Sequence, residues 1–148
     1  MAKTFPSDDV LGPVAWDSEY RWWTFEAGAP GGPPLRGKII PEVEGVLPSD
    51  EWLRLIRECL VWVRANEPQL RQRVAADMFD YWCQTYRDNE DEVDSPEVFA
   101  AAIRTVAVNF SEGRQAEVFY DAAGLFGNHG IWAEVNAIGE FVRGPDFS

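Results

Sequence analysis

The spacing of hydrophobic and polar positions along the chain predicts strands toward both ends and helices between them. The stretch Glu19–Glu26 is rich in aromatic side chains, and Leu35–Val46 is a second apolar run that is interrupted or edged at Pro41. Both runs are typical of β-strands. Residues 27–34 between them are rich in glycine and proline, which break regular structure, so we expect a hairpin with a long loop. Residues 1–18 contain similar breaks and are predicted to be an irregular lead-in.

The middle of the chain predicts three helices. Ser49 is a suitable helix cap, and the apolar positions after it recur every three or four residues, which defines one helical face. The sequence Asn66-Glu67-Pro68 ends this helix and begins a second one, which reaches about Arg87. Ser95 followed by Pro96 starts a short third helix. The predicted buried faces consist of Trp52, Leu55, Ile56, Cys59 and Val63 in the first helix, and of Leu70, Val74, Met78, Tyr81, Trp82 and Thr85 in the second.

From Thr105 onward the apolar residues alternate with polar ones, which is the period of a strand. Strands are predicted at 105–110, 116–121 and 131–135, followed by a short final strand after Gly139. Strands that flank a block of helices favour an α+β fold. We therefore expect residues 1–148 to form one α+β domain, with an antiparallel sheet of about five to six strands. A helical hairpin and a short third helix are expected to pack on one face of that sheet.

The charge of the chain bears on its partners. The chain has 25 acidic and 13 basic residues, which gives a net charge of −12. Such a charge opposes binding to nucleic acid or to an anionic membrane surface, because both depend on neutralisation of phosphates by Lys and Arg. It favours a basic protein or a cation as partner. The alternative is that the charge serves solubility alone.

The expected location is the cytoplasm. The N-terminal residues lack the apolar segment of a secretion signal. The longest strongly apolar stretch, about Cys59–Val63, is much shorter than the roughly 20 residues that span a bilayer. Cys59 and Cys83 are the cysteines of the chain, and both fall on predicted helices. We expect them to be reduced thiols rather than a disulfide.

The sequence predicts no metal and no cofactor. His129 is the single histidine, and no spacing of cysteines and histidines matches a zinc site. The acidic run 88–94 lacks the glycine and the final glutamate of a calcium loop. His129 stands between Gly127 and Gly130, where we interpret it as a turn residue. The alternative is a small hydrolase centred on His129, with Asp121 as the neighbouring acid.

Two groups of residues are candidates for a partner-binding surface. The first is the acidic run, whose charges would steer a basic partner, although a solvated loop is the alternative. The second group consists of Trp22 and Trp132, because tryptophan is enriched in interface hot spots. Successive strand residues point to opposite faces, so of Trp22 and Trp23 the outward one is either covered by the Pro-rich loop or exposed as an anchor. The candidates are Asp88, Glu90, Asp91, Glu92 and Asp94 in the acidic run, and Trp22 and Trp132 among the tryptophans.

The C-terminal part of the chain also resembles known families. The run Ala116–Asp121, the run Leu125–Val135 and the sequence Gly139-Glu140-Phe141 resemble uncharacterised bacterial domain families that include immunity proteins of interbacterial toxin systems. The aromatic strand at 20–25 and the helices at 52–86 are similar to these families in layout.

The resemblance implies an immunity-type protein rather than an enzyme. Such a protein would bind and neutralise a cognate toxin, for which a basic protein is the natural candidate, and would act as a monomer or weak homodimer. The alternatives are the hydrolase centred on His129 and a regulatory protein-binding module.

Overall fold

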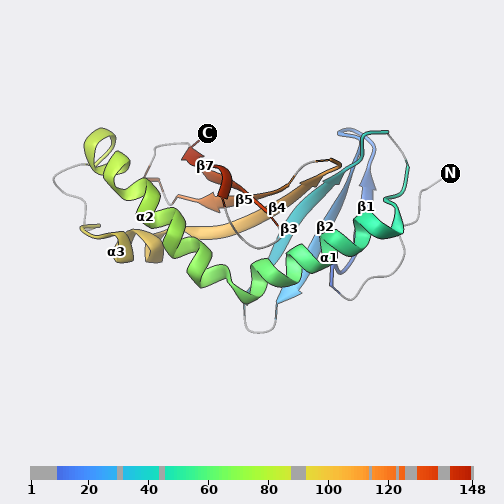
Figure 1. The fold of residues 1–148 in the computed structure, drawn as a ribbon, viewed down its shortest axis with the longest axis horizontal. Helices are drawn as coiled ribbons and strands as arrows, with labels where there is room; N and C mark the ends of the chain where they lie inside the picture. The colour runs from blue at the N-terminus through green and yellow to red at the C-terminus, as the bar shows by residue number, and fades with distance from the viewer. Residues whose placement is uncertain are drawn as a thin grey trace.

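The described part of the protein forms one seven-stranded β-sheet and three α-helices (Figure 1). The computed structural model describes residues 10–29, 32–43, 46–87, 93–113, 115–122, 124–125, 130–136 and 141–147. The strands are β1 (Val14–Asp17), β2 (Trp22–Ala29), β3 (Gly32–Ile40), β4 (Arg104–Ser111), β5 (Ala116–Asp121), β6 (Ile131–Val135) and β7 (Phe141–Phe147). The helices are α1 (Asp50–Ala65), α2 (Glu67–Thr85) and α3 (Pro96–Ala102).

The strands lie in the sheet in the same order as in the chain. Neighbouring strands are antiparallel except at the centre, where β3 and β4 run parallel with Arg36 opposite Ala107 and Ile40 opposite Ser111. Two parallel neighbours need a connection that crosses over the sheet, and the three helices form that connection. The helices therefore lie on one face of the sheet, as Figure 1 shows.

Short polar caps define where two of the helices begin. The hydroxyl of Ser49 accepts the N–H of Trp52 at 3.2 Å, and the hydroxyl of Ser95 accepts the N–H of Val98 at 3.2 Å. Each cap satisfies one of the N–H groups that the first turn of a helix leaves without a partner. Both helix starts agree with the sequence-based expectation.

The first two helices do not form the expected hairpin. Asn66 alone separates them, serving as the C-terminal cap of α1 and the N-terminal cap of α2. An antiparallel helix pair needs a loop of about two to five residues to turn back, so a single residue only changes the direction of the chain. Consequently α1 lies beside β1–β3, and α2 continues toward β4 and β7 (Figure 1).

The core lies between the helices and one face of the sheet. Alternate residues of the strands point into it, among them Trp23 and Phe25 on β2. On the helical side, the rings of Trp82 and Phe99 meet edge to face, with their centroids 5.5 Å apart. The buried indole of Trp82 donates its Nε1–H to the carbonyl oxygen of Leu125 at 2.9 Å, so its polar atom has a partner.

The general α+β class is confirmed, but the expected number of five to six strands is too low. The additional strand is β1, which lies inside the 1–18 region that the sequence predicts to be irregular. Trp16 on β1 is the register partner of Trp23, and the two indoles meet at 5.1 Å between ring centroids.

The strand expected over Leu35–Val46 has different bounds in the structure, because β3 ends at Ile40, immediately before Pro41.

The buried face of α1 differs in part from the predicted one. The structure buries Leu53, Ile56, Leu60 and Val63. Leu55, which was expected in the core, is 47% exposed. Apolar residues cover much of the circumference of this helix, so its sequence period allows two overlapping faces and packing against the sheet selects one of them.

Gly37 provides a test of the central strand pairing. A side chain there would overlap the carbonyl oxygen of Val108 and the ring of Phe25, whereas nothing lies within 4 Å of the position of a side chain at Gly28. We expect Gly37→Ala to lower the free energy of unfolding by about 1–3 kcal/mol or more, since overpacking forces the backbone to shift. Urea denaturation followed by tryptophan fluorescence measures this change. Gly28→Ala is the matched control and should change stability by less than about 0.5 kcal/mol; equal effects of the two variants would contradict the tight β3–β4 approach.

Candidate functional site

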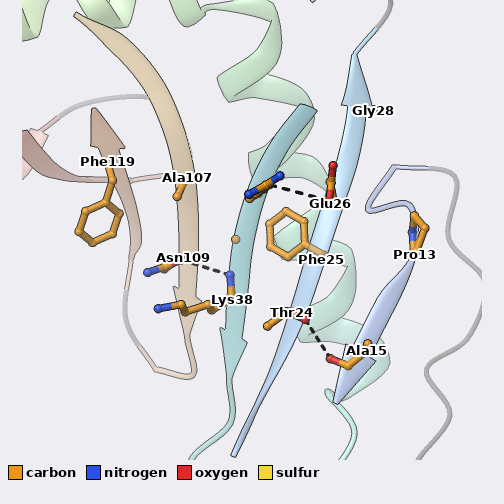
Figure 2. Close-up of a pocket in the computed structure, with 12 residues that line it drawn as sticks. Pro13, Ala15, Thr24, Phe25, Glu26, Gly28, Lys38, Ala107, Asn109 and Phe119 are labelled. Carbon is orange, nitrogen blue, oxygen red and sulfur yellow. Dashed lines mark hydrogen bonds and ion pairs between the residues drawn. The ribbon is translucent and has the colours of Figure 1, made fainter. Parts of the chain in front are cut away.

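The candidate site is the face of the sheet opposite the helices, which we call the open face. Because strand residues alternate between faces, the residues between the core positions point to this side. In Figure 2 the helices lie behind the sheet, and the open face is toward the viewer. Among the described residues, no helix lies on this face (Figure 1). It presents Trp22, Thr24, Glu26, Arg36, Lys38, Ala107, Asn109, Glu117, Phe119, Trp132 and Glu134.

The middle of the open face is hollow. The hollow has a volume of about 1060 Å³ and extends from Pro13, before β1, to Phe119 on β5 (Figure 2). Its floor carries small residues, namely Ala15, Gly28 and Ala107, while the side chains around them are larger. The sequence therefore creates the hollow locally, by placing alanine and glycine at outward positions of neighbouring strands.

A lysine and two aromatic residues meet at one end of the hollow. The ring of Tyr20 stacks on Trp22 with 5.0 Å between centroids and 8° between planes. The Nζ atom of Lys38 lies over the Trp22 ring, 4.2 Å from its centroid. A cation over an indole ring is held by the ring quadrupole, so Trp22 positions the ammonium group as well as offering apolar surface.

Polar groups on β2, β3 and β4 line the rest of the hollow. The Oδ1 atom of Asn109 accepts the backbone N–H of Lys38 at 3.1 Å, which fixes the amide side chain. Arg36 and Glu26 are 3.8 Å apart in a long ion pair between exposed side chains. Such a pair is screened by water and contributes little, so both groups are available to a partner.

A second polar cluster lies on the open face near β7. Glu134 is buried, with 9% of its side chain exposed, and its Oε2 is 2.6 Å from Nε of Arg143. Glu117 is the register partner of Glu134 on β5, so two carboxylates face the same side at adjacent positions. The guanidinium of Arg143 also lies over the ring of Trp132, 5.4 Å from its centroid. Arg143 therefore compensates the buried carboxylate and positions the indole.

The structure brings some of the predicted site residues onto one surface and not others. Trp22 and Trp132 are both half-buried on the open face, four strand spacings apart across the sheet and four residues apart along the strands, or roughly 23 Å. The described contacts of Trp22 are with Tyr20 and Lys38. Asp94 is exposed immediately before α3, in the helical layer. The structure does not bring Asp94 together with the two tryptophans.

The remaining predicted residues of the acidic run, Asp88, Glu90, Asp91 and Glu92, lie outside the described residues, as does His129. Asp121, which the hydrolase alternative places beside His129, is exposed and pairs with Arg104 at 3.3 Å. Within the described ranges, no group of three His, Cys, Asp or Glu side chains lies close enough together to hold a metal ion. None of the helices described is long and apolar enough to cross a membrane.

Sequence reasoning missed Lys38, Asn109 and Phe119, which line the hollow. Their signal is present in the alternation of the strands, since each occupies an outward position next to a buried neighbour. The missing information was which strands are adjacent. Lys38 and Asn109 are 71 positions apart in the chain and become register partners only through the parallel pairing.

Two titratable groups in the core have perturbed pKa values. Burial, followed by the charge of Glu67, raises the pKa of the Tyr120 phenol above its usual range. Burial also raises the pKa of the Cys59 thiol from 9.0 to about 11. Both groups therefore stay neutral at physiological pH, and a neutral thiol is a poor nucleophile. Cys59 and Cys83 are both free cysteines.

The Glu134–Arg143 pair yields a stability prediction. We expect Arg143→Ala to lower the free energy of unfolding by about 1–3 kcal/mol, because it leaves a buried carboxylate without its charged partner. Urea titration measures the change. Arg54→Ala is the control, since Arg54 pairs with Glu58 between exposed side chains and its loss should amount to less than about 0.5 kcal/mol. Adding Glu134→Gln to Arg143→Ala should restore much of the loss; a double variant no more stable than Arg143→Ala would contradict this account.

The Cys59 thiol yields a pH prediction. At pH 8 its thiolate fraction should be roughly 100-fold lower than that of an unperturbed thiol, because its pKa lies about two units higher. Alkylation by iodoacetamide, measured on the Cys83→Ser variant, should be slower by at least that factor than in the same variant unfolded in urea. The rate should rise with pH up to about 11. Similar rates in the folded and unfolded protein would show that Cys59 is not buried in this way.

Comparisons of the chain with protein-family models, with curated proteins and with solved structures give no match. A proposal for the function of this protein therefore has to be argued from the geometry and chemistry of the open face.

Proposed function

We propose that this domain is an immunity-type protein, which binds a cognate bacterial toxin and neutralises it without catalysis of its own. The observation that carries the proposal is the open face. It combines a hollow of about 1060 Å³ with half-buried aromatic side chains, and the described helices lie on the other face of the sheet (Figure 1). Aromatic residues around a desolvated centre are typical of protein–protein interfaces.

The spacing of the aromatic residues fits an interface of ordinary size. Trp22 lies at one side of the hollow, and Phe119 with its register partner Trp132 lies at the other. One partner surface of about 800 Å² covers a separation of roughly 23 Å. A single protein can therefore contact both ends of the open face.

The edges of the sheet favour binding through the face rather than by strand addition. The edge strand β1 has four residues, and the opposite edge strand β7 contains Pro145, which has no N–H group to donate. The edge at β1 therefore offers few backbone groups to a partner strand, and Pro145 interrupts the row of donors on β7. The side chains of the open face offer more contact surface.

The net charge supports a basic partner. A charge of −12 on a small domain attracts a basic protein over long range and raises its association rate. The acidic run 88–94 contributes to this field, and its member Asp94 is exposed. In this proposal the acidic surface steers the toxin, and the aromatic residues of the open face hold it.

The first experiment is affinity capture of the tagged full-length chain from cells that carry its gene, at moderate salt, with mass spectrometry of the bound proteins. We expect a basic protein in one-to-one ratio whose toxicity is relieved by co-expression of this chain. A partner that is not toxic would indicate a regulatory module instead. Capture of nothing when the candidate toxin is supplied would contradict the immunity function.

Substitution at the open face tests where that partner binds. We expect Trp22→Ala and Trp132→Ala each to weaken binding by about 2 kcal/mol, or roughly 30-fold in Kd, as measured by calorimetry. Tyr81→Ala is the control, because Tyr81 is an exposed aromatic residue on α2, in the helical layer. If Tyr81→Ala weakens binding and the tryptophan variants do not, the interface lies on the helical side.

A further inference from the structure

The hollow is locally cationic in a strongly acidic chain. Three charged side chains line it, and they comprise one carboxylate, Glu26, against two cations, Arg36 and Lys38. The chain as a whole carries a net charge of −12. The net charge of the side chains that line the hollow is therefore opposite in sign to that of the whole molecule.

Lys38 carries most of this local charge. Arg36 has a carboxylate partner in Glu26, whereas the ammonium of Lys38 has none among the residues that the structure describes. Lys38 is half-buried, and its Nζ atom is held 4.2 Å from the centroid of the Trp22 ring. A partly desolvated cation that is held in place and lacks a counter-ion attracts an anion more strongly than a freely solvated one.

Asn109 adds a second donor beside the ammonium. It is the register partner of Lys38 on β4, so the two side chains leave neighbouring strands on the same face, about 4.8 Å apart at the backbone. Its Oδ1 atom is occupied by the backbone N–H of Lys38, and its Nδ2 group donates to no described residue. A carboxylate has two acceptor oxygens, and it can take one hydrogen bond from each of these groups.

The floor of the hollow suits an apolar side chain. Ala107 is the register partner of Phe119, so a small residue lies directly beside an aromatic wall. Ala15 and Gly28 extend this shallow floor toward β1 and β2. The space next to the Lys38–Asn109 pair can therefore accept a side chain that packs against Phe119.

We propose that the hollow binds an acidic side chain, Asp or Glu, on a projecting segment of the protein partner, together with an adjacent apolar or aromatic residue. The carboxylate pairs with Lys38 and Asn109, and the apolar residue packs on Ala107 against Phe119. This rests on the proposed function and specifies the chemistry of the segment that the open face recognises.

The proposal is compatible with a partner that is basic overall. Long-range attraction depends on net charge, whereas the fit at the centre of an interface depends on individual groups. A basic surface with one projecting carboxylate matches both the negative net charge of the chain and the cationic lining of the hollow. An ordinary basic protein without such a carboxylate would leave Lys38 buried beside like charge, which disfavours the wrong partner.

The test uses a library of random dodecapeptides displayed on phage and selected on the immobilised full-length chain. We expect the enriched peptides to carry Asp or Glu within two positions of Phe, Tyr, Trp or Leu. A labelled peptide of this type should bind Lys38→Glu at least about tenfold more weakly, because a charged hydrogen bond is replaced by repulsion. Arg54→Glu is the control; it makes the same change of charge at an exposed position on α1 and should retain binding.

A second measurement does not depend on the variant. Lys3 and Lys38 are the lysines of the chain, so reductive methylation followed by mass spectrometry reports on Lys38 individually. Bound peptide should protect Lys38 and leave Lys3 reactive. The proposal is overturned if the selection enriches no acidic motif, or if the peptide leaves Lys38 unprotected. Because no toxin is needed, this result is independent of whether toxin capture succeeds.

Discussion

The parallel pairing of β3 with β4 is the constraint on which the rest of the structure depends. It joins an N-terminal group of three strands to a C-terminal group of four, and so makes one sheet from two antiparallel segments. The approach is tight at Gly37, where the ring of Phe25 and the carbonyl oxygen of Val108 occupy the space of a side chain. A larger residue there would separate the two halves of the sheet.

The same pairing determines where function can reside. A parallel connection has to cross over the sheet, so the helices between β3 and β4 all lie on one face. That face becomes the core, and the other is left to strand residues alone. The hollow lies over the β3–β4 junction, because Gly37, Lys38, Ala107 and Asn109 all come from these two strands. The step that closes the fold therefore also assembles the candidate site.

The sequence predicts the local elements well and the long-range contacts poorly. The order of the helices and of six strands follows from apolar periodicity and from caps such as Ser49 and Ser95. The short strand β1 was missed because Gly12 and Pro13 precede it and four residues carry little periodic signal. The prediction that α1 and α2 form a hairpin was wrong, because the sequence does not show that Asn66 alone separates the two helices.

The candidate site was predicted only in part, because the sequence does not show which strands are neighbours or in which register they pair. Strand alternation places one of Trp22 and Trp23 outward, and the structure shows that it is Trp22. What covers Trp22 was not predictable, because Lys38 reaches it from β3 and the side-chain direction depends on register. Asp94, from the acidic run, and the two tryptophans were both candidates for one partner-binding surface, yet Asp94 belongs to the helical layer.

The contrast between total and local charge is the feature that distinguishes the open face from an ordinary solvated sheet. A surface kept acidic for solubility alone would gain nothing from a half-buried lysine at its centre, since partial burial of a cation that has no carboxylate partner among the described residues is unfavourable. Trp22 offsets part of this cost, but an indole does not neutralise a charge. An anion in the hollow would offset the rest, which is why the partner segment that we propose carries a carboxylate. The proposed recognition of an acidic segment therefore depends on Trp22 and Lys38 together, since Trp22 holds the ammonium group in place and Lys38 supplies the charge.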